Sequence, residues 1–274
     1  MTSLHLPARS RAPRAAFGQM VLNEARLAWR QPAGIIAGVG ISLLLLVIFG
    51  EVPVFQQASA RLGGLSAFQI YIPILIAFSI GVLALTYLPG PLVSYRELGI
   101  LRRLSTTPVP SSWVLAAQLV VQACLMAVAV LTLLVVSIAF FGVSAPKNPG
   151  GLVLALVLSI AALFSIGLAI AAAAKTSGAA RGLMAAAFYP MMFLSGLYYP
   201  VQLMPGVLQA ISHASPLGAA VAAIQDAMLQ GFPPAVTARA PPRQARAVIR
   251  VPVGVMARYS QRKKRLATKP NTTA

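Results

Sequence analysis

Long apolar runs dominate the pattern of hydrophobic and polar positions in this chain. About 20 apolar helical residues cross the hydrocarbon core of a bilayer, because a helix satisfies its own backbone hydrogen bonds there. We predict membrane spans at five runs that lack Asp, Glu, Lys and Arg: 33–49, 70–93, 113–141, 152–174 and 183–199. Prolines in the second run predict kinks or an early end there. The predicted fold class is an all-α, polytopic membrane protein built as a helical bundle.

The residues before the first run predict a helix of a different kind. Between positions 15 and 32, apolar side chains such as Trp29 alternate with polar and cationic ones, and Pro32 ends the pattern. Such a helix places its apolar side in the lipid and its charges among the headgroups. We therefore predict an interfacial amphipathic helix at 15–32, preceded by a disordered basic arm at 1–14.

Composition places the whole chain in the membrane class. Hydrophobic residues make up 58% of it and charged residues 9%, whereas a soluble domain carries about 25% charged residues. Lys and Arg number 22 against four Asp and Glu, and in a multi-span chain such an excess reflects orientation and contact with anionic lipids. We expect membrane lipids as partners and no nucleic acid. Cys124 is the one cysteine, so no metal site is predicted.

Charge between the runs orients them, because short loops rich in Lys and Arg stay in the cytoplasm. One set of loops and the amino-terminal segment carry most of the cations, among them Arg26, Arg30, Arg96, Arg102, Arg103, Lys175 and Arg181. The other loops carry Arg61 and Lys147. We predict a multi-pass protein of the cell (plasma) membrane, in particular a bacterial inner membrane, with a cytoplasmic amino terminus.

A charged segment between the second and third runs departs from the membrane pattern. Ser94 and Glu97 fit the S-x-x-E capping box that starts a helix, and Pro108 prevents its continuation. Apolar positions flanked by arginines would then lie on a short cytoplasmic helix at 94–106, which suits docking into a groove of another protein. The alternative is that these arginines only obey the positive-inside rule.

Two stretches of sequence resemble one known family. The stretch SYRELGILRRLSTTPVP, residues 94–110, resembles the cytoplasmic coupling region of type-2 ABC exporter permeases, which include drug-resistance, lipid and polysaccharide exporters. FLSGLYYP at 193–200, followed by Leu203, Pro205 and Ser215-Pro216-Leu217, resembles the fifth span of that family, its re-entrant extracellular segment and the approach to its sixth span. The similarity covers roughly residues 15–232.

The resemblance implies a permease subunit that pairs with a second copy or a paralogue and with cytoplasmic ABC ATP-binding subunits. ATP and Mg would be held by those subunits, since this chain lacks a GxxxxGK[ST] phosphate loop and so is not expected to be an enzyme itself. The implied function is ATP-driven export of an amphipathic drug, lipid or glycan, with drug or antibiotic resistance as one outcome. The implied contacts with the ATPase are Arg96, Glu97, Gly99, Leu101, Arg102 and Arg103.

The resemblance also suggests a substrate path between the second and fifth spans. Candidate residues for the path are Phe78, Phe188, Met191, Met192 and Phe193, because aromatic and thioether side chains suit bulky amphipathic molecules. Plain packing or lipid contact is the alternative for each. Tyr199, Pro200 and Pro205 are the candidate extracellular gate. No catalytic residues are predicted, since no nucleophile and base stand in a recognisable arrangement.

The carboxyl end departs from the family. Residues 33–232 form the predicted transmembrane domain, but after Pro234 the expected sixth apolar span is missing, unless 207–229 crosses. Residues 233–274 form an atypical basic tail, expected to be disordered, which is either an altered reading frame or truncation product or a lipid-binding extension. Two further functions stay open: a non-transporting membrane scaffold or assembly component, and an inactive permease.

Overall fold

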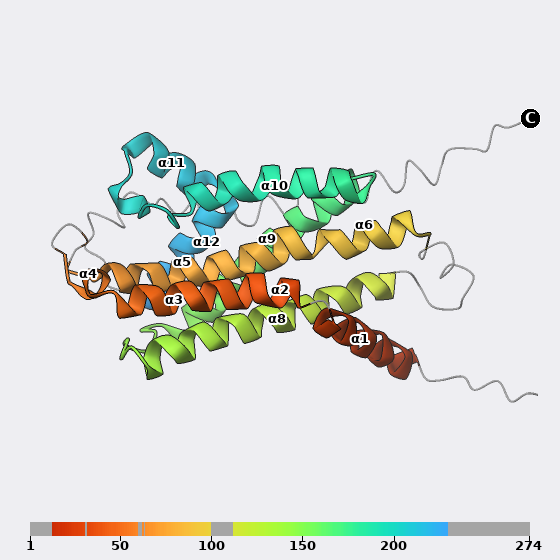
Figure 1. Ribbon diagram of the computed structural model, residues 1–274, viewed down its shortest axis with the longest axis horizontal. Coiled ribbons are helices and arrows are strands. Elements are labelled where there is room, and N and C mark those ends of the chain that lie inside the picture. The colour runs from red at the N-terminus through yellow and green to blue at the C-terminus, as the bar shows by residue number, and fades with distance from the viewer. Residues whose placement is uncertain (1–12, 31, 60–61, 63, 100–111, 230–274) are drawn as a thin grey trace, which may run out of the picture.

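The computed structural model describes residues 13–30, 32–59, 62, 64–99 and 112–229. The regular elements in that part of the chain are helices: α1 (Pro13–Arg30), α2 (Ala33–Ile35), η1 (Ile36–Gly40), α3 (Ile41–Glu51), α4 (Pro53–Gln56), α5 (Ala67–Gly81), η3 (Val82–Tyr87), α6 (Pro89–Glu97), α8 (Ser112–Ala139), α9 (Pro149–Ala173), α10 (Ser177–Leu194), η4 (Val201–Leu203), α11 (Gly206–Ala214) and α12 (Pro216–Leu229). The predicted all-α bundle is confirmed (Figure 1). The tail at 233–274 lies outside the described residues. The predicted basic arm at 1–14 also lies outside them, except for its last two residues, which begin α1.

Four continuous helical stretches are long and apolar enough to cross a membrane: Ala33–Glu51, Ala67–Glu97, Trp113–Ala139 and Pro149–Ala173. They coincide with the first four predicted runs. The fifth run falls on α10, which is not among the four because its first turns carry glycine, serine and Arg181. Helices α11 and α12 meet at 94° and add a span only if the bent pair counts as one. The number of spans beyond four therefore stays a prediction.

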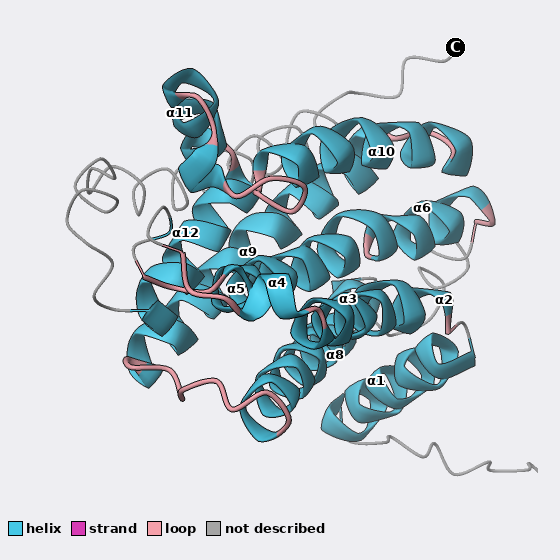
Figure 2. Ribbon diagram, turned by 60° about the vertical axis from the view of Figure 1, so that its left-hand side comes forward, coloured by secondary structure: helices cyan, strands magenta, loops and turns pink. Residues whose placement is uncertain are grey.

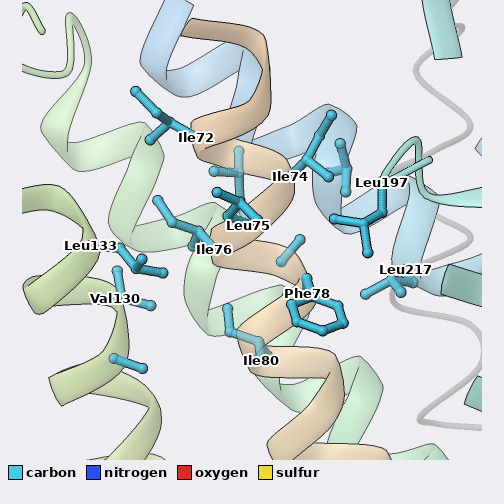
Figure 3. Close-up of a cluster of buried hydrophobic side chains, with 14 of the residues drawn as sticks. Ile72, Ile74, Leu75, Ile76, Phe78, Ile80, Val130, Leu133, Leu197 and Leu217 are labelled. Carbon is cyan, nitrogen blue, oxygen red and sulfur yellow. The ribbon is translucent and has the colours of Figure 1, made fainter. Parts of the chain in front are cut away.

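The second span forms the centre of the bundle. Within it, 94% of the most apolar window is buried, compared with 28% to 39% for the other three spans. Helices α3, α8, α9 and α12 pack around α5, so its side chains are covered on all sides (Figures 1 and 2). Figure 3 shows isoleucines of α5 pointing in opposite directions, toward Val130 and Leu133 on one side and toward Leu197 on the other. Because lipid tails are as apolar as leucine, close packing rather than water exclusion holds these helices together.

The second span does not end early, so that part of the prediction was wrong; the kinks predicted at its prolines stay a prediction. Pro73 lies inside α5, and a π-helical segment, η3, precedes Pro89. The Leu88 N–H donates to the Leu83 carbonyl, five residues back, at 3.1 Å. This wider turn accommodates a proline ring that would press on the carbonyl four residues before it in a regular α-helix. Ala67–Glu97 is therefore one helical stretch of 31 residues.

A capping box starts the central helix. The Ser66 hydroxyl accepts a hydrogen bond from the Gln69 N–H at 3.2 Å, and the Gln69 side chain accepts one from the Ser66 N–H at 3.2 Å. Replacing Ser66 with alanine removes the cap, which costs about 1 kcal/mol, and we expect a melting temperature lower by about 2–4 °C. Thermal unfolding of the full-length chain in detergent measures this. Ser144→Ala, in the exposed loop before α9, is the control; an equal loss there would contradict the capping role.

Candidate functional site

The charged segment begins as the last turn of α6. Ser94 and Glu97 lie at the carboxyl end of a helix that started at Pro89, so the predicted capping box at a helix start was wrong. The helix ends at Glu97, and Gly99, two residues later, has a φ of +66°, a left-handed conformation that suits glycine. A stretch of 31 residues is about 46 Å long, whereas the hydrocarbon core is about 30 Å thick, so one or both ends of this helix reach past the lipid tails.

Side chains of this turn bind three other elements of the chain. The Tyr95 hydroxyl donates to Glu24 of α1 at 3.0 Å. The Arg96 guanidinium donates to the Ala174 carbonyl, which caps the end of α9. The Glu97 carboxylate accepts hydrogen bonds from the hydroxyl and, at 2.8 Å, the backbone N–H of Ser177, the first residue of α10. We call Tyr95, Arg96 and Glu97 the α6 clamp.

Charge favours each of the clamp's helix contacts. The carboxyl end of a helix carries partial negative charge and its amino end partial positive charge. Arg96 therefore meets the negative end of α9, and Glu97 meets the positive end of α10. Each side chain also satisfies a backbone group that has no partner within its own helix. The clamp thus joins the central helix to the short turn between α9 and α10, and Figure 1 shows α6 and the start of α10 at the same end of the bundle.

Glu24 is the point where the clamp meets α1. It lies on the less exposed side of that helix, with Phe17 and Ala28, while Arg26 and Arg30 are exposed. Phe17 packs edge-on against Trp113 of α8, with 5.8 Å between ring centres. Burial raises the pKa of the Glu24 carboxyl above its ordinary value, and the hydrogen bond from Tyr95 opposes part of that rise. Helix α1 is therefore fastened to both α6 and α8.

The structure divides the residues predicted to contact an ATPase. Arg96 and Glu97 have partners inside the chain, and Gly99 follows the end of α6 in a left-handed conformation. Leu101, Arg102 and Arg103 lie outside the described residues, as does most of the predicted helix at 94–106, so their role stays a prediction. Hydrogen bonds of the clamp therefore join the end of α6 to α1, α9 and α10.

The predicted path residues do not lie on one surface. Phe78 and Phe188 are 6% and 8% exposed, with ring centres 6.1 Å apart, and they belong to the core. Met191 and Met192 are partly buried against that core. Phe193 is 51% exposed and lies beside Tyr198, with 6.2 Å between ring centres.

The predicted gate forms a compact turn after α10. Tyr199 and Pro205 are exposed, whereas Pro200 is buried. The Ser212 hydroxyl donates to the Leu194 carbonyl at 2.5 Å, which holds α11 against the end of α10. The Gln225 side chain donates to the Ile70 carbonyl at 3.4 Å and accepts from Gln202 at 3.3 Å. Hydrogen bonds therefore tie this turn to α12 and the start of α5.

Sequence reasoning missed the partners of the clamp. Ser177, Ala174 and Glu24 are distant in sequence from α6, and nothing in their local pattern marks them. One signal was present: the chain has four acidic residues, so each acidic residue is an unusual feature. Two of them take part in these contacts: Glu97 belongs to the clamp, and Glu24 accepts from Tyr95 of the clamp. Tyr189 and Tyr198, exposed near Phe193, were also missed.

Comparisons with known proteins add to this geometry. The family model described as ABC-2 type transporter matches residues 15–229, which is most of the chain. The chain is also 29% identical over 206 residues to the protein named "Putative transport permease ycf38" of Porphyra purpurea. That similarity covers 72% of this chain and 68% of the relative.

Proposed function

Since the chain belongs to the ABC-2 type transporter family, as its two sequence stretches predicted, we propose that it is the membrane-spanning permease of an ATP-driven exporter. A separate ABC ATP-binding subunit supplies the energy and holds ATP and Mg, and a second copy or paralogue completes the complex. The cargo is an amphipathic molecule such as a drug, lipid or glycan. Antibiotic or drug resistance would be one physiological outcome.

The α6 clamp is the observation that carries this proposal. An exporter has to convert motion of a cytoplasmic motor into motion of several membrane helices. The segment beyond Gly99 follows directly from the central helix, and the clamp fastens that helix to α1 and to the α9–α10 turn. A push from an ATP-binding subunit at Leu101, Arg102 and Arg103 would therefore move these elements as one unit.

The charge distribution supports a cytoplasmic position for the clamp. Arg26, Arg30, Arg96, Lys175 and Arg181 lie at the clamp end of the bundle, and Lys147 lies in the loop at the opposite end. Loops rich in Lys and Arg stay on the cytoplasmic side. On this orientation, the turn with Tyr199, Pro200 and Pro205 faces outward and acts as the gate in the cell membrane.

The exposed aromatic side chains on α10 and in the turn after it are the proposed cargo surface. Phe193, Tyr198 and Tyr189 present ring faces that suit an amphipathic molecule, and Met192 beside them adapts its shape. Phe78 and Phe188 support this surface from the core, because they are buried behind it. The side chains of α5 are buried in the bundle, so a cargo molecule cannot contact them. We therefore place the accessible part of the path on the exposed face of α10.

Co-purification with an ATP-binding subunit tests the proposed function. Replacing Arg102 and Arg103 with glutamate reverses the charge of the docking segment, so we expect at least a several-fold loss of the co-purified subunit. Arg26→Glu with Arg30→Glu, on the exposed side of α1, is the matched control and should retain it. If the unaltered chain co-purifies no ATP-binding subunit from its source cells, the exporter proposal fails. Co-purification without transport in vesicles would favour a scaffold.

A further inference from the structure

A small cavity lies at the clamp end of the bundle, beside α1. Its volume is about 80 Å³, and residues of α1, α2, η3, α6 and α8 line it. Apolar side chains make up most of its wall, including Leu27, Leu83, Val121 and Leu125. Its polar lining consists of Glu24, Tyr87, Gln118 and Gln122.

Two glutamine side chains in this wall have amide oxygens that accept no hydrogen bond. Gln118 is 4% exposed and Gln122 is 8% exposed, and both lie on α8, four residues apart and so on one face of the helix. The Oε1 atom of each has no hydrogen-bond partner among the described residues. The amide nitrogen of Gln118 faces the Leu88 carbonyl at 3.5 Å, and its oxygen is the end without a partner. A buried acceptor without a donor destabilises the folded protein. A ligand that donates hydrogen bonds to these oxygens would remove that cost.

The third acceptor is the carboxylate of Glu24. Tyr95 donates one hydrogen bond to its Oε1 atom, and a carboxylate accepts more than one. None of the described residues that line the cavity is basic, although the chain carries a net charge of +18. The residues that line the cavity therefore include one acidic side chain and two amides whose buried oxygens are unpaired.

We propose that this cavity binds the primary ammonium group of a small amphiphile. An ammonium group has three donors and no acceptor, which matches one carboxylate and two amide oxygens. The cavity is smaller than the roughly 150 Å³ cavity that holds benzene in an engineered core, so it takes an ammonium head and a methylene or two, not a bulky cargo. The site goes beyond the proposed export function and does not depend on it.

The surroundings of the cavity fit a lipid headgroup as one source of the ammonium. Trp29 on α1 is 79% exposed, and Leu22 and Leu27 are also exposed, which is typical of a helix at the lipid interface. Arg26 and Arg30 are exposed on the same helix and suit the phosphate of an aminophospholipid. A free amine would offer the same ammonium without the phosphate contact.

Thermal unfolding with matched lipids tests the proposal. Short-chain phosphatidylethanolamine and phosphatidylcholine are added at equal concentrations to the full-length chain in detergent. The first has three N–H donors, and the second has none. At about ten times its dissociation constant, phosphatidylethanolamine should raise the melting temperature by about 3–6 °C more than phosphatidylcholine. Ethanolamine alone is tested separately. If it raises the melting temperature as much as phosphatidylethanolamine does, a free amine is sufficient; if it raises it less, the lipid is the source of the ammonium group.

Variants tie the effect to the cavity. Glu24→Gln keeps an acceptor for Tyr95 but removes the charge, and Gln122→Met replaces one amide with a side chain of similar shape. Each should abolish most of the difference between the two lipids. Gln225→Met, at the far end of the bundle, is the control and should keep it. Equal stabilisation by both lipids, a difference that survives both variants, or ordered water alone in the cavity of a lipid-supplemented structure would overturn the proposal.

Discussion

Replacing Gly167 with alanine is expected to destabilise the bundle, although alanine is the better helix former. Gly167 is buried in α9, and a Cβ atom there would lie 2.3 Å from the Ala84 carbonyl oxygen of η3. A backbone atom cannot turn aside as a side chain can, so the two helices would have to separate. Overpacking of this kind costs about 1–3 kcal/mol, which exceeds the gain of about 0.5–1 kcal/mol from removing a helical glycine.

Gly182 in α10 provides the matched control for that substitution. It also lies inside a helix, but a Cβ atom there would meet nothing within 4 Å. Gly182→Ala should therefore keep or raise the melting temperature in detergent, whereas Gly167→Ala should lower it. Gly167→Val adds two more methyl groups against the same carbonyl and should prevent accumulation of folded protein. Equal melting temperatures for the two alanine variants would contradict the close contact between α9 and η3.

Replacing Glu97 with alanine is expected to uncouple ATP hydrolysis from transport. The substitution removes the two hydrogen bonds that Ser177, at the start of α10, donates to Glu97, and leaves the 3.4 Å contact between the Ser94 and Ser177 hydroxyls as the remaining polar link to α6 there. On the proposed function, the ATP-binding subunit still docks, since Arg102 and Arg103 are unchanged. Transport per ATP hydrolysed, measured in reconstituted vesicles, should fall several-fold, while co-purification of the subunit stays unchanged.

Two comparisons separate the clamp from other roles of Glu97. Glu51→Ala removes an exposed acidic residue at the opposite end of the bundle and should leave coupling intact. Ser177→Gly removes the hydroxyl donor, so its effect and that of Glu97→Ala should not add in the double variant. Loss of the ATP-binding subunit in Glu97→Ala would instead place Glu97 in the contact with that subunit.

The sequence by itself determined the membrane class, four spans, the helix before them and the family. Apolar runs without charge and the two family-like stretches were sufficient, because insertion into lipid depends on the composition of a segment and not on its neighbours. The prolines of the second span wrongly suggested an early end, because the helix continues past Pro89 after a π-helical segment. The S-x-x-E pattern wrongly predicted a new helix start, because the preceding span continues as a helix through Ser94 and Glu97.

Only the tertiary structure decided which helix is central and what the polar residues bind. Hydropathy does not distinguish burial in protein from contact with lipid, and Ala67–Glu97, the most buried span, has the lowest mean hydropathy of the four. For the same reason, the sequence could not show that Phe78 is core while Phe193 is exposed. The contact between Glu97 and Ser177 joins residues far apart in the chain, and the packing of α6 against α9 and α10 brings them together.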